Sequence, residues 1–92
     1  MFVETITAPY DEWQRWTERL RLFTDPPAAL VSSVAWPSDP ETITNVNVWD
    51  TASAVADFYV ERVQAVIDAD GPPAHKPVRH GSPVAVYVRQ TI

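Results

Sequence analysis

The sequence predicts an α+β domain whose strands and helices follow one another in the order β-α-β-β-α-β. The clearest sign is a change of period in the middle of the chain. Residues 42–49 alternate as a strand does, and residues 52–69 then place apolar side chains three and four positions apart, as a helix does. A similar pair, residues 2–7 and 9–23, comes earlier. With 92 residues, the whole chain, 1–92, is expected to form a single domain.

The first strand and the first helix are predicted from residue preferences. Residues 2–7 are rich in β-branched side chains, which favour a strand. Residues 9–23 open with a proline, suited to a first helical turn, and two acidic residues that match the helix dipole. Residues 25–27, Asp-Pro-Pro, end this helix because proline lacks the backbone N–H. Its predicted apolar side consists of Tyr10, Trp13, Trp16, Leu20 and Phe23.

A hairpin is predicted in the middle of the chain. Residues 29–36 alternate as a strand, and the proline-containing residues 36–41 are too few for a crossover connection. The strand at 42–49 should therefore return antiparallel. Asp50 and Thr51 carry side-chain oxygen atoms that can cap the helix that follows.

The last part of the chain is predicted to be a loop followed by one more strand. Gly71 stops the second helix. Residues 71–83 contain four prolines and two glycines, so we expect no regular structure over most of this segment. Residues 84–89 alternate between valine and other side chains and predict the final strand.

This order of elements, with right-handed crossovers, gives a ferredoxin-like domain, in which a four-stranded antiparallel sheet carries both helices on one face. The other face is left uncovered. We expect that face to be too apolar to remain bare, and two sheets packed face to face would cover it. The four tryptophans, three tyrosines and three phenylalanines also favour a homodimer. The residues expected on the uncovered face are Val31, Ser33, Asn45, Asn47, Trp49, Ala85 and Tyr87.

Composition excludes several classes of function. The formal net charge of −5 argues against nucleic acid and against anionic membrane surfaces as partners. No cysteine is present, which excludes disulfides, thiolate nucleophiles and cysteine metal sites. The sequence contains neither a basic leader nor an apolar segment of about 20 residues. We therefore expect a cytoplasmic protein with no membrane partner.

The junction between the hairpin and the second helix carries a family resemblance. Residues 48–51, Val-Trp-Asp-Thr, followed by a helix with Ala54, Phe58 and Tyr59, are similar to the dimeric α+β barrel superfamily, which includes the antibiotic-biosynthesis monooxygenase-like proteins. The resemblance implies that two ferredoxin-like subunits form a closed barrel. It also implies a ligand pocket between the sheet and the helices of each subunit. Members include cofactor-free oxygenases, haem-degrading enzymes, isomerases and many small proteins without an assigned activity.

Haem chemistry is not expected in this chain. The haem-degrading members of the superfamily use an asparagine on the first strand and a histidine on the second helix. This sequence has Thr5 and Thr7 on the first strand, and its second helix contains no histidine. We expect no cofactor.

Three residues of the hairpin strand are candidates for ligand binding. Trp49 matches the tryptophan of the superfamily and could stack on a planar substrate, or it could be a core residue that closes the end of the barrel. Asn45 and Asn47 could donate hydrogen bonds to a substrate carbonyl or stabilise an enolate, because an amide donates without losing a proton. Asparagines at a strand edge or an interface would have the same appearance in the sequence.

Further candidates lie near the end of the chain. His75 and His80, next to Lys76 and Arg79, could act as a general base, or they could belong to a solvated loop. Two histidines five residues apart without a carboxylate at ligand spacing do not indicate a metal site. Tyr87 could donate a hydrogen bond inside the pocket.

Two functions are compatible with these observations. One is a homodimeric protein that binds a small aromatic or polyketide-like molecule without catalysis. The alternative is a cofactor-independent monooxygenase or isomerase that acts on such a molecule, which rests on the resemblance. A titratable side chain within reach of an enclosed cavity would favour the enzyme over the binding protein.

Overall fold

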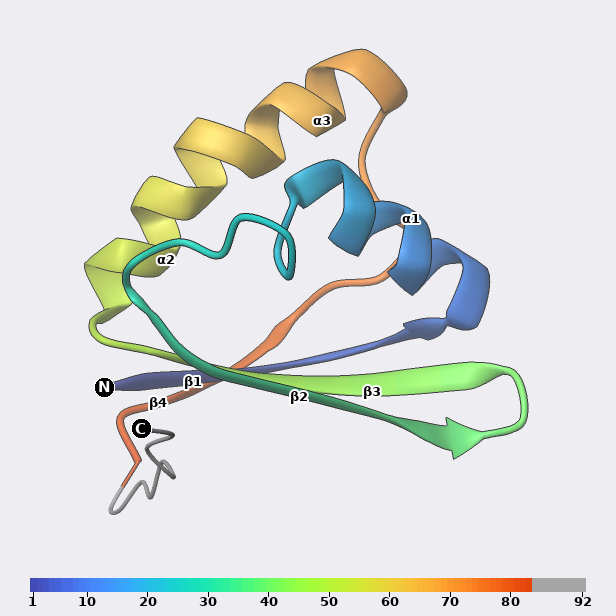
Figure 1. Cartoon of the computed structure of the whole chain (residues 1–92), viewed down its shortest axis with the longest axis horizontal. Helices are drawn as coiled ribbons and strands as arrows, with labels where there is room; N and C mark the ends of the chain where they lie inside the picture. The colour runs from blue at the N-terminus through green and yellow to red at the C-terminus, as the bar shows by residue number, and fades with distance from the viewer. Residues whose placement is uncertain (84–92) are drawn as a thin grey trace.

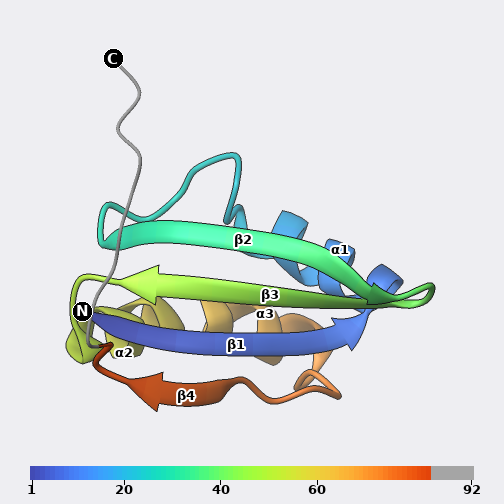
Figure 2. The same cartoon turned by 90° about the horizontal axis from the view of Figure 1, so that it is seen from below.

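The computed structural model describes residues 1–83 and contains a four-stranded antiparallel sheet covered by helices (Figure 1). The strands lie in the order β2-β3-β1-β4. Figure 2 shows the sheet from its open side, with the helices behind it. The predicted ferredoxin-like α+β fold is confirmed. The strands are β1 (Phe2–Pro9), β2 (Leu30–Asp39), β3 (Thr42–Trp49) and β4 (Val78–Gly81).

The two predicted helices are present. The first is α1 (Tyr10–Leu20), and Arg21 ends it in a left-handed conformation with φ 55°. The second consists of α2 (Ala52–Phe58), a π-helical segment η1 (Tyr59–Val63) and α3 (Gln64–Asp70). The backbone remains right-handed helical at both junctions, so these three segments form one continuous rod. No helix within residues 1–83 is long and apolar enough to cross a membrane.

The ends of the second helix follow the sequence prediction. The Thr51 side chain accepts a hydrogen bond from the backbone N–H of Ala54 at 3.2 Å, which satisfies one of the free donors at the helix start. Gly71, with φ 88°, follows the last turn and has a backbone conformation that residues with a Cβ atom rarely adopt. The strand-to-helix junction at Asp50 and Thr51 is therefore confirmed.

Two strands differ from the prediction. β2 continues to Asp39, so the hairpin turn is formed by Pro40 and Glu41 alone. β4 lies inside the segment 71–83, which was predicted to be largely irregular. Pairing with β1 permits a strand here despite the nearby prolines. Pro77 and Pro83 flank the four-residue strand and do not interrupt it. The strand predicted at 84–89 lies outside the described residues.

The assignment of sheet faces was wrong for β3 and for Ser33 of β2, which pairs with Asn47 and donates to its buried side chain. Asn45, Asn47 and Trp49 were expected on the uncovered face, but they face the helices and are 0%, 2% and 0% exposed. The free energy gained by burying the large Trp49 indole exceeds the cost of burying the two amides, because the amides form hydrogen bonds in the interior. The alternate residues of the same strand, Val46 and Val48 among them, face the open side.

Arg62 joins the second helix to the end of the first. Its Nη1 donates hydrogen bonds to the backbone carbonyls of Leu20, at 3.1 Å, and Asp25, at 2.7 Å. The same guanidinium lies over the Phe58 ring, 5.7 Å from its centroid. The last carbonyls of a helix have no partner within the helix, so Arg62 supplies donors where α1 requires them.

Replacing Arg62 should loosen the contact between the helices. We expect Arg62→Met to lower the free energy of unfolding by about 1–2 kcal/mol, since the substitution removes charged hydrogen bonds to two carbonyls. Arg15→Met is the matched control, because Arg15 is exposed on α1, and it should change stability by less than about 0.5 kcal/mol. Urea denaturation followed by circular dichroism measures both. Equal stabilities of the two variants would contradict the role of Arg62.

Candidate functional site

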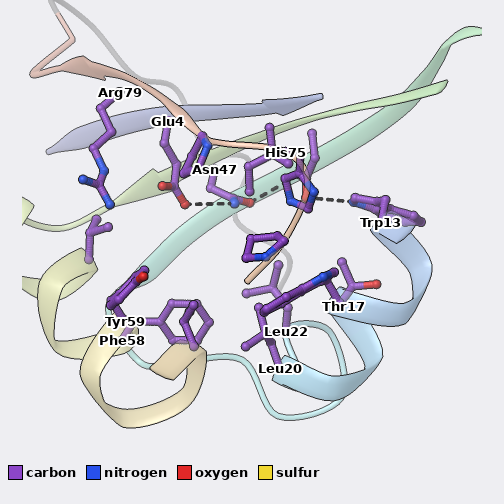
Figure 3. A pocket seen from close by; sticks show the side chains of 17 residues that line it. Glu4, Trp13, Thr17, Leu20, Leu22, Asn47, Phe58, Tyr59, His75 and Arg79 are labelled. Carbon is purple, nitrogen blue, oxygen red and sulfur yellow. Dashed lines mark hydrogen bonds between the residues drawn. The ribbon is translucent and has the colours of Figure 1, made fainter. Parts of the chain in front are cut away.

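A cavity of about 110 Å³ lies between the helix-facing side of the sheet and the helices (Figure 3). Its walls combine aromatic and aliphatic side chains, and its floor on the sheet carries polar side chains. The wall is completed by the loop that connects α3 to β4. The aromatic wall residues are Trp13, Trp16, Phe58 and Tyr59, the polar floor residues are Glu4, Asn45 and Asn47, and the loop contributes Pro73, His75 and Pro77.

Glu4 is the most unusual residue of the floor. It is in the middle of β1 and only 5% exposed. Its Oε1 accepts one hydrogen bond from the Asn47 side-chain amide, at 3.2 Å, and another from the Trp49 indole N–H, at 3.1 Å. Strand register explains these contacts, because Glu4 pairs with Asn47 and Phe2 with Trp49 across β1 and β3. A buried carboxyl group is thus held in place by two neutral donors.

The asparagines continue this network across the sheet. Ser33 on β2 donates to the Asn47 side-chain oxygen at 2.6 Å, and the Asn45 amide donates to the Ser33 hydroxyl and to the Val34 carbonyl, both at 3.0 Å. The Trp13 indole of α1 donates to the Asn45 oxygen at 3.2 Å. The network therefore joins three strands and one helix.

Two polar atoms of the lining are buried without a hydrogen-bond partner within residues 1–83, the indole N–H of Trp16 and Nδ1 of His75. Oε2 of Glu4 also accepts no hydrogen bond from these residues, since both of the bonds to this group go to Oε1. An unpaired buried donor or acceptor costs about 1–3 kcal/mol. A polar ligand or water molecule in the cavity would reduce this cost.

The loop that closes the cavity is attached to α1 through Glu12. Glu12 Oε1 accepts a hydrogen bond from the backbone N–H of Ala74 at 2.9 Å and lies 3.3 Å from His75 Nδ1, within ion-pair distance but outside good hydrogen-bond geometry. The Ala74 amide, followed by His75 and Arg15, lowers the pKa of Glu12, and partial burial opposes this change.

A wider groove of about 630 Å³ lies on the outer side of the same loop. The groove and the cavity share five lining residues, so the two spaces adjoin along this loop. The shared residues are Tyr59, Pro73, His75, Pro77 and Arg79.

The structure separates the predicted ligand-binding residues. Asn45, Asn47 and His75 line the cavity. Trp49 is buried behind the lining, where it donates to Glu4 and packs against Phe58 with ring centroids 5.0 Å apart. His80 lies on the open side of the sheet, where its Nε2 is 2.7 Å from the Thr5 hydroxyl. Tyr87 lies outside the described residues, and a ligand-binding role for each of these residues stays a prediction.

Sequence reasoning missed Glu4, although a signal was present. Glu4 alternates with Phe2, Ile6 and Ala8, the residues of β1 that face the helices. A single charged residue in the buried register of a strand indicates a special environment, because carboxylates are almost never fully buried without a partner. Among residues 1–83, no group of histidine and acidic side chains is arranged to hold a metal ion.

Comparison with known proteins gave no match, since no family model, no curated protein and no solved structure is similar enough to this chain to be a relative. The description of the site therefore rests on the chain's own geometry.

The Glu12 contact predicts a pH-dependent contribution to stability. Its pKa in the folded protein is below its ordinary value of 4.5, so the ionised group stabilises the fold. This contribution is complete above the unfolded value and is lost as pH falls through the lower folded value. We expect wild type to be more stable than Glu12→Gln at pH 7, and the difference to shrink below pH 4.5.

Urea denaturation at pH 7, 5, 4 and 3 measures this difference. Glu18→Gln, an exposed change on the same helix, is the control and should follow wild type over this range. A constant difference between wild type and Glu12→Gln down to pH 3 would show that Glu12 does not hold the loop by its charge.

Proposed function

We propose that this protein binds a small molecule with one aromatic ring in the cavity between the sheet and the helices. The observation that carries the proposal is the combination of aromatic walls with a fixed polar floor. Small-molecule sites are typically apolar cavities with a few convergent polar groups. Trp13, Trp16, Phe58 and Tyr59 provide surfaces for a ring, and Glu4 and Asn47 provide orientation.

The volume limits the size of the ligand. An engineered apolar cavity of about 150 Å³ binds benzene, and the cavity here is about 110 Å³. One ring is therefore the upper limit in this conformation. A fused, polyketide-like molecule would enter only if the loop at 71–77 moved and the ligand extended into the outer groove.

Membership of the dimeric α+β barrel superfamily is part of this proposal. Three features support it. The strand order is that of a ferredoxin-like domain, Trp49 precedes a helix capped by Thr51, and the cavity lies between sheet and helices, where that superfamily binds its ligands. The predicted cytoplasmic location is compatible with a small-molecule binder and stays a prediction.

Filling the cavity should abolish binding. Val63 lines the cavity, so Val63→Phe places a ring in the space that a ligand would occupy. We expect benzene, at about ten times its Kd, to raise the melting temperature of wild type by about 6–11 °C and that of Val63→Phe by less than about 1 °C. Differential scanning calorimetry measures both shifts.

Val60→Phe is the matched control, because Val60 is on the same helical segment but 73% exposed. This variant should respond to benzene as wild type does. NMR spectra should also show shifts of the Trp13 and Trp16 indole N–H signals, since both rings line the cavity. Unchanged spectra at saturating benzene would refute the proposed binding site.

A homodimer is the second part of the proposal. No element of residues 1–83 covers the open side of the sheet (Figure 2). On this side, strand pairing places Val34 beside Val46, Trp36 beside Thr44 and Val78 beside Thr5. Val34, Trp36 and Val78 are 56%, 43% and 59% exposed. An apolar face of this kind is a typical protein interface. A second copy of the chain would bury it.

The dimer has a direct test. Light scattering across a dilution series should give a mass of twice the chain's 10.3 kDa. Val34→Lys should shift the protein to a monomer, because it places a charge in the apolar face. Val60→Lys on the helix side should leave the mass unchanged. A monomeric wild type at micromolar concentration would rule out this interface.

The enzyme alternative is favoured by one observation. Glu4, Tyr59 and His75 are titratable and line the cavity, so a proton acceptor is within reach of a bound molecule. An isomerase that moves a proton uses such a group directly, whereas a cofactor-independent monooxygenase also requires a substrate that reacts with oxygen. Release of a chemically changed molecule, in a manner that depends on Glu4, distinguishes this alternative from binding alone.

A further inference from the structure

The carboxyl group of Glu4 points from the sheet into a cavity with aromatic walls (Figure 3). We propose that the ligand is a single-ring aromatic amine, and that its protonated ammonium group binds Glu4. This inference rests on the proposed binding function and specifies which class of small molecule the cavity selects.

The first argument is the incomplete pairing of Glu4. Both donors that reach this residue, the Asn47 amide and the Trp49 indole, bind Oε1. Among residues 1–83, no basic side chain lies within ion-pair distance of either oxygen. Buried carboxylates in proteins are normally paired with a cation. An ammonium group in the cavity would donate to Oε2 and provide the missing positive charge.

Arg79 is the nearest rival for this role. It pairs with Glu4 across β1 and β4, and its side chain also points toward the helices (Figure 3). However, Arg79 is exposed and lines both the cavity and the outer groove. Its guanidinium can remain hydrated at the boundary between the two spaces. Glu4 is therefore left available to a ligand.

The walls are the second argument. Four of the lining residues, Trp13, Trp16, Phe58 and Tyr59, are aromatic, and aromatic rings attract cations through their faces. Phe58 already has the Arg62 guanidinium over its ring, which shows that this cluster accepts a positive group. The net charge of −5 adds a general attraction for cations. An aromatic acid would meet Glu4 with the same charge, and we expect it to be excluded.

The experiment compares two ligands of matched shape. Benzylamine carries an ammonium group at pH 7, and ethylbenzene has a methyl group in its place. We expect wild type to bind benzylamine at least tenfold more tightly than ethylbenzene, as measured by isothermal titration calorimetry. Glu4→Gln should lose this preference because it retains an acceptor oxygen and removes the charge. Glu18→Gln makes the same change of net charge at an exposed position and should retain it.

NMR of the wild-type protein gives a second measurement that does not depend on a variant. The Trp49 indole N–H does not line the cavity but donates to Glu4. Benzylamine should therefore shift its signal, whereas ethylbenzene should leave it nearly unchanged. The Trp16 signal should respond to both ligands, because that ring lines the cavity.

The outcomes separate this inference from the proposed function. Equal affinity of wild type for benzylamine and ethylbenzene would overturn the role of Glu4 and leave aromatic binding intact. Binding of neither ligand would overturn both. If Glu4→Gln does not bind ethylbenzene, the substitution has damaged the cavity of the variant. The test then depends on the preference of wild type for benzylamine and on the Trp49 signal. A Trp49 signal that moves equally with both ligands would refute the inference.

Discussion

The hydrogen-bond network on the helix-facing side of the sheet is the constraint on which the rest of the structure depends. Glu4, Asn47 and Ser33 connect β1, β3 and β2, and Asn45 connects the sheet to Trp13 of α1. Buried polar groups must be paired, so strand register and helix position are not free to vary independently. A slip of one residue in β3 would turn both amides to the open side and leave Glu4 without donors.

The same network also explains why a cavity persists here. A polar floor cannot be covered by apolar side chains without loss of its remaining hydrogen-bonding capacity, as Oε2 of Glu4 illustrates, which accepts no hydrogen bond from residues 1–83. The walls above it include large rigid rings, Trp16 and Phe58 among them, and Trp16 meets the His75 ring edge to face. The π-helical segment Tyr59–Val63 lies at this level and has a wider turn than the α-helix on each side.

The sequence was sufficient to predict the fold, but it was not sufficient to predict which polar side chains are buried at the site. Changes in the spacing of apolar residues along the chain located both helices and the hairpin. The Thr51 cap was predictable because its chemistry is local. The burial of Asn45 and Asn47 was not predictable, since their partners come from residues 12 and 43 positions away. β4 depends likewise on pairing with β1, a contact that the proline-rich local sequence does not indicate.

β1 links the two faces that the proposed function requires. Its alternate residues contribute Glu4 to the cavity and Thr5 to the open side, where a second copy is proposed to pack. A strand held on both faces has little freedom to shift, so a dimer would also fix the position of the Glu4 carboxyl group. Conversely, a cation bound to Glu4 would pair a buried charge and stabilise the register that presents the apolar face. Ligand binding and dimerisation would then reinforce each other through one strand, without a conformational change of the helices.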